Sequence, residues 1–245
     1  MSGDVAVIGR RGRFLVAEPL FERGPQAAIA GGVRVRGGEM VVLERHARGV
    51  RVLEVLGAPD RAGEVVGALM VERGLERGFD ESLADAAERA ALDAAEAELE
   101  RRDLRDLPTF TVDPASARDF DDAVSAAPEG DGTRLWIHIA DVAAHVRPGS
   151  ALDREALRRG NSTYVPGAVE PMLPPALSAV ACSLAAGVER LAVTAEIVVS
   201  AEGEARSASF YRSRIRSDRR LDYDELDRIF AGRAPPAEIA APLEL

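Results

Sequence analysis

The stretch TVDPASARDFDDAV, residues 111–124, concentrates negative charge between two apolar segments. Four aspartates fall within ten positions: Asp113, Asp119, Asp121 and Asp122. Only Arg118 lies among them. Two unit charges about 4 Å apart repel by roughly 1 kcal/mol in water and roughly 4 kcal/mol at an effective dielectric of 20. A solvated surface loop would screen this repulsion. A hard divalent cation would convert it into binding, because carboxylate oxygens are its natural ligands.

The spacing of the aspartates narrows the choice of cation. A calcium-binding EF-hand loop needs an oxygen ligand at its fifth position and Gly at its sixth, but counted from Asp119 these are Ala123 and Val124. Mg²⁺ instead binds through a few carboxylates together with waters and substrate phosphates. Two such ions can activate a water and stabilise the leaving oxygen of a phosphodiester. The cluster therefore predicts a site for one or two Mg²⁺ ions that performs phosphoryl transfer or nucleic-acid cleavage.

Charge elsewhere in the chain is unevenly distributed. The net charge of −10 argues against a nucleic-acid-binding protein, but local patches decide such contacts more than the total does. All 31 basic residues are arginine, which suits bidentate phosphate contacts, although a coding bias explains this as simply. The segment ARSASFYRSRIRSDRR, residues 205–220, holds six arginines and one aspartate. Arg212, Arg214 and Arg216 are therefore predicted to contact phosphates, while alternate residues face the core.

Length and composition indicate a globular protein of one or two domains. Cys182 is the single cysteine, so no intrachain disulfide can form, and a reducing cytoplasm is predicted. No apolar run reaches the length of a signal peptide or the roughly 18 residues of a membrane span. We therefore expect a cytoplasmic protein without a membrane partner. The sequence contains no glycine-rich phosphate loop, and no small-molecule cofactor beyond the metal is expected.

The pattern of apolar residues predicts an α+β fold that begins with a small barrel over residues 1–57. Its predicted strands cover residues 4–9, 13–19, 32–44 and 49–57. Short strands separated by glycines fit an OB or cold-shock-like barrel. Such barrels bind single strands through stacked aromatic side chains. Only Phe14 and Phe21 are available here, so a purely structural or weakly binding barrel is a close alternative.

A helical connector is predicted over residues 58–103, followed by a mixed domain over 104–245. In the connector, one helix covers 58–74, with Asp60 as its N-cap, and a second covers 80–102, with Arg102 in its last turn. The predicted elements of the mixed domain are strands at 106–113, 121–127 and 134–146, a helix at 150–160 capped by Ser150, a hairpin over 189–217 and a helix at 222–232.

The motifs after residue 103 resemble the catalytic domain of the ribonuclease II/ribonuclease R (RNB) family. They run in order to about residue 228: DLRDLPTFTVDPASARDFDDAV, LWIHIADVAAHVRPGSALDREALRRGNSTYVP, EPMLPPALS, CSLAAGVERLAVTAEI and FYRSRIRSDRRLDYDEL. The barrel region is similar, more weakly, to the cold-shock-like part of that family. The resemblance implies Mg²⁺-dependent, processive hydrolysis of single-stranded RNA from its 3′ end, releasing nucleoside 5′-monophosphates.

The resemblance also implies roles for individual residues. The four aspartates match the family's acidic residues that hold the catalytic metals and organise the attacking water. Tyr164 in NSTYVP matches the tyrosine that packs against the nucleotide at the 3′ end. From the residues alone, a core or turn aromatic would be the preferred interpretation of Tyr164.

Family catalytic domains continue well past Leu245, with a catalytic arginine and a second aromatic that this chain lacks. We therefore expect an incomplete catalytic domain with poor activity. One alternative is an inactive fragment that still binds RNA or metal. Another is an unrelated Mg²⁺-dependent phosphohydrolase, but DFDDA misses the DxDxT or DxDxV loop that such an enzyme needs.

Three further polar residues are predicted to be structural. His138 and His145 are expected to pack or to donate hydrogen bonds, because the aspartates already supply enough oxygen ligands for a metal. Cys182 has no CxxC partner and is expected to be a small buried apolar residue.

Overall fold

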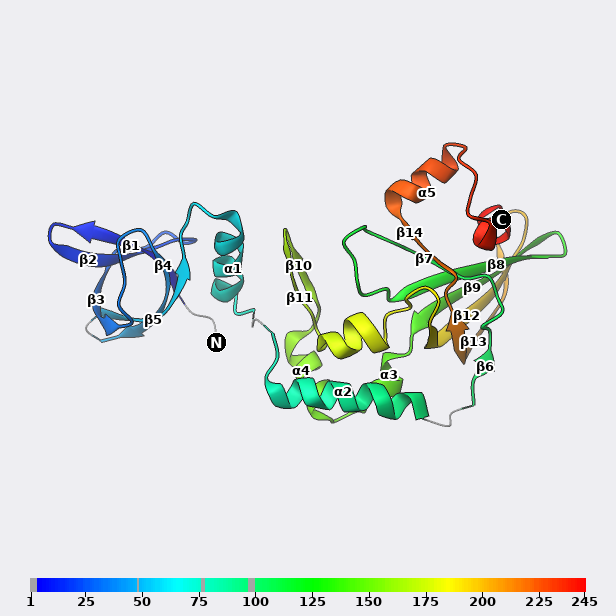
Figure 1. Ribbon diagram of the computed structural model, residues 1–245, viewed down its shortest axis with the longest axis horizontal. Coiled ribbons are helices and arrows are strands. Elements are labelled where there is room, and N and C mark those ends of the chain that lie inside the picture. Colours follow the sequence, from blue (N-terminus) through cyan, green and yellow to red (C-terminus); the bar gives the residue numbers. More distant parts are fainter. Residues whose placement is uncertain (1–3, 48, 76–77, 97–99) are drawn as a thin grey trace. The chain divides into compact units, whose positions relative to one another are not determined.

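The computed structural model describes residues 4–47, 49–75, 78–96 and 100–245 (Figure 1). The chain divides into two compact units. The first combines Met1–Phe79 with Arg159–Met172 and is called the barrel unit below. The second combines Asp80–Arg158 with Leu173–Leu245 and is called the sheet unit. Each unit is described by itself.

Five strands close the barrel in the order β1-β2-β3-β5-β4. They are β1 (Asp4–Arg11), β2 (Phe14–Pro19), β3 (Ala27–Gly32), β4 (Met40–His46) and β5 (Gly49–Gly57). Alternate apolar residues such as Ile8, Val41 and Val52 fill the interior and are almost inaccessible. A closed barrel of five short strands is the OB-type architecture predicted for residues 1–57.

One predicted strand of the barrel is confirmed only over residues 40–44, which belong to β4. Residues 33–39 form a loop between β3 and β4, where a single strand over 32–44 was expected. Gly38 adopts a φ of 92°, which few other residues tolerate, and its N–H donates to the Ile8 carbonyl at 2.7 Å. Strand β3, AAIAGG, was missed because alanine and glycine carry little strand propensity.

Helix α1 (Ala62–Glu72) packs on the barrel through Ala68, beside Val5 and Met40. The predicted cap at Asp60 is wrong, since Arg61 occupies the N-cap position and forms no side-chain cap. The Glu64 carboxylate accepts the Ala58 N–H at 2.5 Å instead. The barrel unit also contains a hairpin of β10 (Thr163–Val165) and β11 (Ala168–Glu170) that was not predicted.

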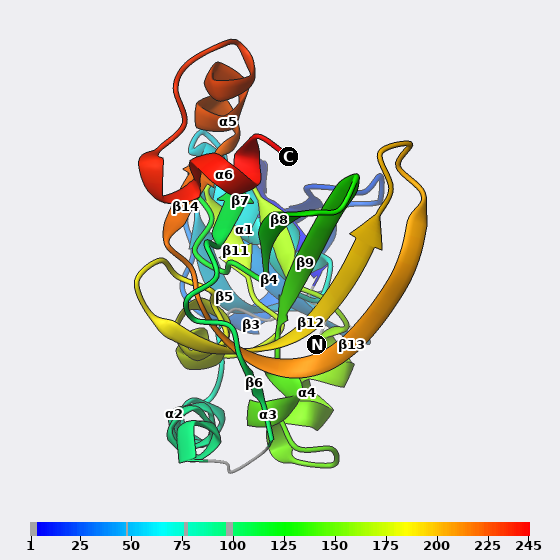
Figure 2. The same ribbon diagram turned by 90° about the vertical axis from the view of Figure 1, so that its right-hand side faces the viewer.

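The sheet unit is built on seven strands in the order β14-β7-β8-β9-β12-β13-β6 (Figure 2). They are β6 (Arg102–Asp103), β7 (Phe110–Asp113), β8 (Asp122–Glu129), β9 (Gly132–Ala140), β12 (Glu189–Val199), β13 (Ala205–Arg216) and β14 (Arg219–Asp222). The central strands are antiparallel, and β6 and β14 pair in parallel at the edges. The predicted hairpin over 189–217 is confirmed as β12 and β13.

Helices flank this sheet and complete two cores. They are α2 (Glu81–Glu96), α3 (Val142–His145), α4 (Ala151–Arg159), the π-helix η1 (Ala176–Ala181), α5 (Tyr223–Phe230), the 3₁₀-helix η2 (Ala237–Ile239) and α6 (Ala240–Leu243). The larger core gathers around Leu177, Leu184 and Ile215, and the smaller around Phe110 and Leu221. None of the helices in the described ranges is both long and apolar enough to cross a bilayer.

The helix predictions are partly corrected. Ser150 caps α4, since its Oγ accepts the Asp153 N–H at 3.2 Å, as predicted. Arg102 belongs to β6 and not to the last turn of α2. The strand predicted over 134–146 ends at Ala140, because Asp141 turns the chain into α3.

A row of fully buried polar side chains crosses the sheet and confirms the structural role of His138. The row consists of Thr109, Ser125, His138, Thr194 and Ser213. The His138 imidazole joins Ser125 Oγ at 3.2 Å to Thr194 Oγ1 at 2.9 Å. Burial lowers the pKa of His138 to about 4, so the ring is neutral at pH 7. The row ties β8, β9, β12 and β13 together from inside the sheet.

The two remaining predicted structural residues are also packed. His145 lies in α3, and its Nδ1 is 3.3 Å from the Ala90 carbonyl oxygen of α2. Cys182 is 3% exposed, and burial raises the pKa of its thiol to about 12. The α+β class with an N-terminal barrel is confirmed. The predicted connector forms no unit of its own, because α1 belongs to the barrel unit and α2 to the sheet unit.

Candidate active site

The acidic cluster lies at one end of the sheet unit. Strand β7 ends at Asp113, and strand β8 begins at Asp122. The two strands are antiparallel, so the last residue of β7 and the first residue of β8 lie at the same end of the sheet. Between them, the aspartate loop (residues 114–121) carries Asp119 and Asp121. The strand order thus brings together the four side chains that the sequence singled out.

The carboxylates influence one another. Partial burial raises the pKa of Asp113 most, and the charges of Asp122 and Asp119 raise it further, while Thr111 and Arg220 oppose the rise. Desolvation by the surrounding chain also raises the pKa of Asp121. Asp119, Asp122 and Asp113 add to that rise. Burial is thus the main cause of both raised pKa values, and the like charges of the neighbouring aspartates add to it.

The donor atoms of the acidic cluster are chemically suited to a hard divalent cation. All four donors are carboxylates, and Asp113 Oδ2 is buried with no hydrogen-bond partner among the described residues. Leaving a buried oxygen unpaired is unfavourable, and a cation would satisfy it. However, in the described part of the chain no three His, Cys, Asp or Glu side chains are grouped closely enough to hold an ion. Convergence of the four carboxylates on a metal position stays a prediction.

The aspartate loop is held by contacts that the sequence did not reveal. The Ala140 N–H donates to the Asp121 carbonyl at 2.9 Å, and the Leu184 N–H donates to the Phe120 carbonyl at 2.8 Å. Two side chains, Ser183 and Arg220, also bind the loop. Both lie within segments that carry the family resemblance, but nothing local in those segments indicates a partner 65 or 106 residues away.

Strand register places Arg212 on the same sheet face as Asp122. Asp122 lies opposite Ile139 on β9. Ile139 lies opposite Val193 on β12, and Val193 lies opposite Arg212 on β13. Directly opposed residues share a face, and three strand spacings of about 4.8 Å span roughly 14 Å. Arg212 Nε also lies 3.6 Å from the carboxylate of the buried Asp141.

Arg214 and Arg216 share this face with Arg212, because they alternate with the buried Ser213 and Ile215. The predicted alternation along this strand is thus confirmed. Arg216 is exposed, and Arg214 is half-buried. Contact between these arginines and phosphate remains a prediction.

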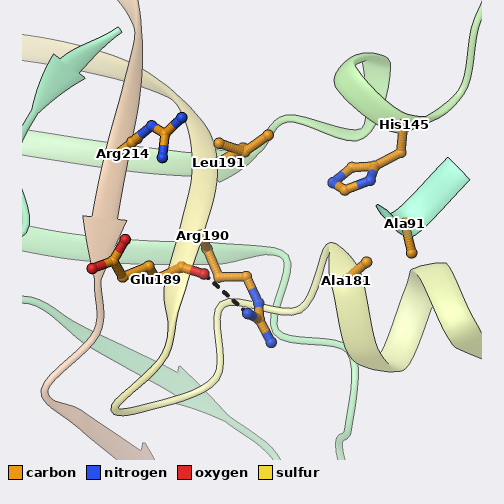
Figure 3. Close-up of a pocket in the computed structure, with 7 residues that line it drawn as sticks. All are labelled: Ala91, His145, Ala181, Glu189, Arg190, Leu191 and Arg214. Carbon is orange, nitrogen blue, oxygen red and sulfur yellow. Dashed lines mark hydrogen bonds between the residues drawn. The ribbon is translucent and has the colours of Figure 1, made fainter. Parts of the chain in front are cut away.

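Arg214 also lines a pocket of about 220 Å³ (Figure 3). Its walls are formed by Ala91, His145, Ala181, Glu189, Arg190, Leu191 and Arg214. Arg190 donates from Nε to the Ser183 carbonyl at 2.7 Å and from Nη1 to the Glu189 carbonyl at 3.0 Å. None of the four aspartates is among the described residues that line this pocket. This pocket is therefore separate from the acidic cluster.

Tyr164 belongs to the barrel unit. It lies on β10 opposite Val169 of β11, and its side chain is 59% exposed. This exposure excludes the core position that the residue type alone would favour. Its predicted contact with the 3′ nucleotide remains a prediction, since the aspartates belong to the other unit.

A second candidate surface lies at one end of the barrel and is called the barrel arginine patch. It comprises Arg10, Arg11 and Arg13 at the β1–β2 turn and Arg34 and Arg36 in the 33–39 loop. A Cβ placed on Gly37 would lie 3.7 Å from Arg10 Nε, so the loop and the turn are neighbours. Within the described residues, none of these guanidinium groups forms an ion pair.

The barrel arginine patch also presents an aromatic ring. Phe14 is 63% exposed, and Arg13 Cζ lies 5.1 Å from the centroid of its ring. Phe21, the other aromatic of this region, packs beside Met40 in the core between the barrel and α1. Only one of the two aromatics considered from the sequence is therefore placed to stack on a base.

Comparison with known proteins agrees with the motifs. Residues 101–244 match the model of the RNB domain. Ribonuclease R of Acidithiobacillus ferrooxidans is 43% identical over 205 residues, which cover 80% of this chain and 47% of that protein. Ribonuclease R of Chlamydia trachomatis is 54% identical over 130 residues, or 53% of this chain and 19% of that protein. The chain thus spans about half or less of the length of these relatives.

Solved structures share the fold. Mycoplasma genitalium RNase R in complex with double-stranded RNA superposes with a TM-score of 0.82 at 23% identity, covering 100% of this chain and 46% of that chain. Yeast Ssd1, a pseudonuclease, superposes with a TM-score of 0.70 at 17% identity, covering 98% of this chain and 33% of that chain. At such identities the likeness concerns the fold alone.

Proposed function

Because the chain belongs to the RNB-domain family, we propose that it carries the acidic site of a hydrolytic exoribonuclease. The enzyme would degrade single-stranded RNA in the 3′-to-5′ direction and release nucleoside 5′-monophosphates. The observation that carries this proposal is the gathering of four aspartates at one sheet edge, inside the segment that matches the RNB domain.

The four aspartates would hold one or two Mg²⁺ ions. When bound, Mg²⁺ supplies an activated water and stabilises charge on the leaving oxygen. The chain contributes concentrated negative charge, which favours a divalent cation over water alone. Such a cation would provide a partner for the buried Asp113 Oδ2.

Other residues would place the RNA. Arg212 lies on the same face as Asp122, so its guanidinium is suited to a phosphate upstream of the scissile bond. Tyr164, exposed on β10, would pack against the 3′ nucleotide. The barrel arginine patch, with Phe14 beside it, would hold a more distant part of the strand.

An alternative is a fragment that binds RNA or metal without hydrolysing it. In the described part of the chain, no three His, Cys, Asp or Glu side chains already form a metal-binding group, which is compatible with this alternative. A pseudonuclease of the same fold, yeast Ssd1, shows that the architecture does not guarantee cleavage.

The test uses a 5′-labelled single-stranded RNA incubated with the chain and Mg²⁺. Stepwise shortening with release of 5′-monophosphates, abolished by EDTA and by Asp121→Asn, is the expected result. Retained RNA binding with no shortening would assign the chain to the alternative. Internal cleavage at scattered positions would contradict an exonuclease.

A further inference from the structure

We propose that Ser183 and Arg220 are positioning residues that together hold both ends of the aspartate loop in place for catalysis. The inference rests on the proposed function for its catalytic meaning, but the contacts themselves stand apart from it. Neither Ser183 nor Arg220 is one of the predicted metal ligands. Their side chains bind backbone atoms of the aspartate loop, and Arg220 also contacts the ring of Phe120.

The loop needs such support because its own sequence provides little. Pro114, Ala115 and Ser116 are exposed, and proline donates no backbone hydrogen bond. Within the loop, the Ala117 N–H donates to the Pro114 carbonyl at 2.9 Å. A loop that carries two aspartates of a metal site must nonetheless be fixed, since a displacement of 1 Å can reduce a rate about 10²-fold.

Ser183 holds the C-terminal half of the loop. Its side chain is fully buried, and its Oγ donates to the Arg118 carbonyl at 2.9 Å while accepting the Phe120 N–H at 3.1 Å. One hydroxyl thus binds the residues on both sides of Asp119. The adjacent Leu184 N–H donates to the Phe120 carbonyl at 2.8 Å, so two successive residues secure Phe120.

The segment that carries Ser183 is itself anchored. Arg190 Nε donates to the Ser183 carbonyl at 2.7 Å, and burial lowers the pKa of Arg190. The neighbouring Cys182 is buried in the larger core of the sheet unit. The hydroxyl of Ser183 therefore projects from a rigid part of the fold, which is what a positioning group requires.

Arg220 holds the N-terminal half of the loop and reaches its far end. Its Nη2 donates to the Pro114 carbonyl at 2.8 Å and to the Ala115 carbonyl at 2.9 Å. Its Cζ lies 4.9 Å from the centroid of the Phe120 ring. The guanidinium thus contacts residues on both sides of Asp119. Strand β14 aligns Arg220 with Thr111 and Asp222 with Asp113, which fixes Arg220 beside the end of β7.

These contacts have a common geometric effect. Both residues bind Phe120, one at its backbone and one at its ring, and Asp121 and Asp122 follow directly. Each also binds a residue on the opposite side of Asp119 from Phe120. Fixing Phe120 therefore sets where three of the four carboxylates leave the backbone.

The test compares Ser183→Ala, Arg220→Met and Arg220→Lys with two control variants. Arg219→Gln removes a charge from the same strand, and Arg219 pairs with Glu225 at 3.0 Å, away from the loop. Ser178→Ala removes a hydroxyl from the same region, where Ser178 donates to the Leu173 carbonyl at 3.2 Å. Amide hydrogen exchange at Ala117, Phe120 and Leu184 reports the order of the loop, and Mn²⁺ titration followed by electron paramagnetic resonance reports the metal site.

In Ser183→Ala and Arg220→Met, we expect the loop amides to exchange hydrogen at least tenfold faster than in the wild type. Both variants should also bind Mn²⁺ about tenfold more weakly. Arg220→Lys, which keeps one donor but loses the planar stack, should fall between wild type and Arg220→Met. The exchange rates of the β12 and β13 amides should be unchanged in these variants. The two control variants should keep the wild-type loop exchange rates and Mn²⁺ affinity. If hydrolysis is present, kcat should fall with little change in KM.

Unchanged loop exchange and Mn²⁺ affinity in folded Ser183→Ala and Arg220→Met would overturn the inference. A loss of protection throughout the sheet in Arg220→Lys would also overturn it, because it would assign Arg220 to the fold as a whole. Failure of the proposed function gives a different result. In that case the wild-type chain neither hydrolyses RNA nor binds Mn²⁺, while the exchange measurement still decides whether the loop is held.

Discussion

The barrel arginine patch and the sheet unit use arginine in opposite ways. In the barrel arginine patch, five guanidinium groups face solvent without an ion-pair partner among the described residues. In the sheet unit, Arg101 forms a buried ion pair with Asp141 at 2.7 Å, and Arg206 pairs with Asp131 at 2.5 Å. A guanidinium already bound to a carboxylate or carbonyl can contact a phosphate only by giving up that bond. Unpaired arginine is thus available to a ligand, whereas most arginine of the sheet unit stabilises the fold.

Among the substitutions considered, Asp121→Asn in the sheet unit should distinguish the roles of the two units most clearly. This change removes one charge and keeps the shape of the side chain, so turnover should fall while RNA affinity is retained. Loss of one electrostatic group at a transition state commonly costs about 10²–10³-fold in rate. Single-turnover hydrolysis and filter binding of the same RNA measure the two quantities. A variant that loses binding and turnover equally would show that the barrel unit does not carry the affinity.

Local patterns in the sequence predicted the acidic cluster and much of the sheet. The four aspartates fall within ten residues, and β12 and β13 alternate regularly around the turn at 201–204, so both could be identified without knowledge of distant partners. Reliance on local patterns also explains why the loop at residues 33–39 was predicted as part of a strand over 32–44. Glycines that interrupt an apolar pattern can continue a strand or open a loop, and the choice depends on the tertiary hydrogen bond from Gly38 to Ile8.

Contacts between distant segments could not be predicted in this way. Ser183 and Arg220 reach the aspartate loop across 65 and 106 residues. The parallel pairing of β14 with β7, which brings Arg220 there, has no signature in a four-residue strand. His138 was assigned to hydrogen bonding correctly, but its partners Ser125 and Thr194 come from two other strands.

Acid should destabilise the sheet unit through His138 and leave the barrel unit without this effect. The pKa of His138 is lowered from an ordinary value of 6.5 to about 4, so the folded state binds fewer protons than the unfolded state. The stability it contributes is present above pH 6.5 and is lost progressively as the pH falls toward 4. This difference between the folded and unfolded pKa values of His138 corresponds to about 3 kcal/mol in the free energy of unfolding.

Urea denaturation followed by fluorescence of Trp136, the single tryptophan, measures this effect in the sheet unit. His138→Gln should flatten the dependence of stability on pH between 6.5 and 4, at the cost of a lower overall stability. His46→Gln, which changes an exposed residue of the barrel unit, serves as the matched control and should leave that dependence unchanged. The same slope in wild type and His138→Gln would contradict the assignment.

Phe14→Ala should weaken RNA binding without changing the maximal rate. Stacking of one base on an aromatic side chain contributes about 1–3 kcal/mol, so the dissociation constant should rise roughly 5-fold to 150-fold. The control is Phe230→Ala, which removes a ring of similar exposure, 73%, from the sheet unit. Fluorescence anisotropy of a labelled single strand gives the affinity. Equal losses from the two substitutions would mean that exposed aromatics act nonspecifically.

The smallest effect, and the most direct test of the arginine comparison, is the dependence of RNA affinity on salt. Each phosphate neutralised on a single strand contributes roughly 0.7 to the slope of log affinity against log salt concentration. Arg10→Gln combined with Arg13→Gln removes two unpaired charges, so the slope should become shallower by up to about 1.4. Arg134→Gln and Arg206→Gln remove charges that are already neutralised by Glu129 and by Asp131. These two substitutions should leave the slope unchanged within about 0.3 and lower the stability of the sheet unit only slightly, because exposed ion pairs contribute little. Equal changes of slope for both pairs would show that RNA displaces the intramolecular carboxylates, and the distinction between available and committed arginine would then fail.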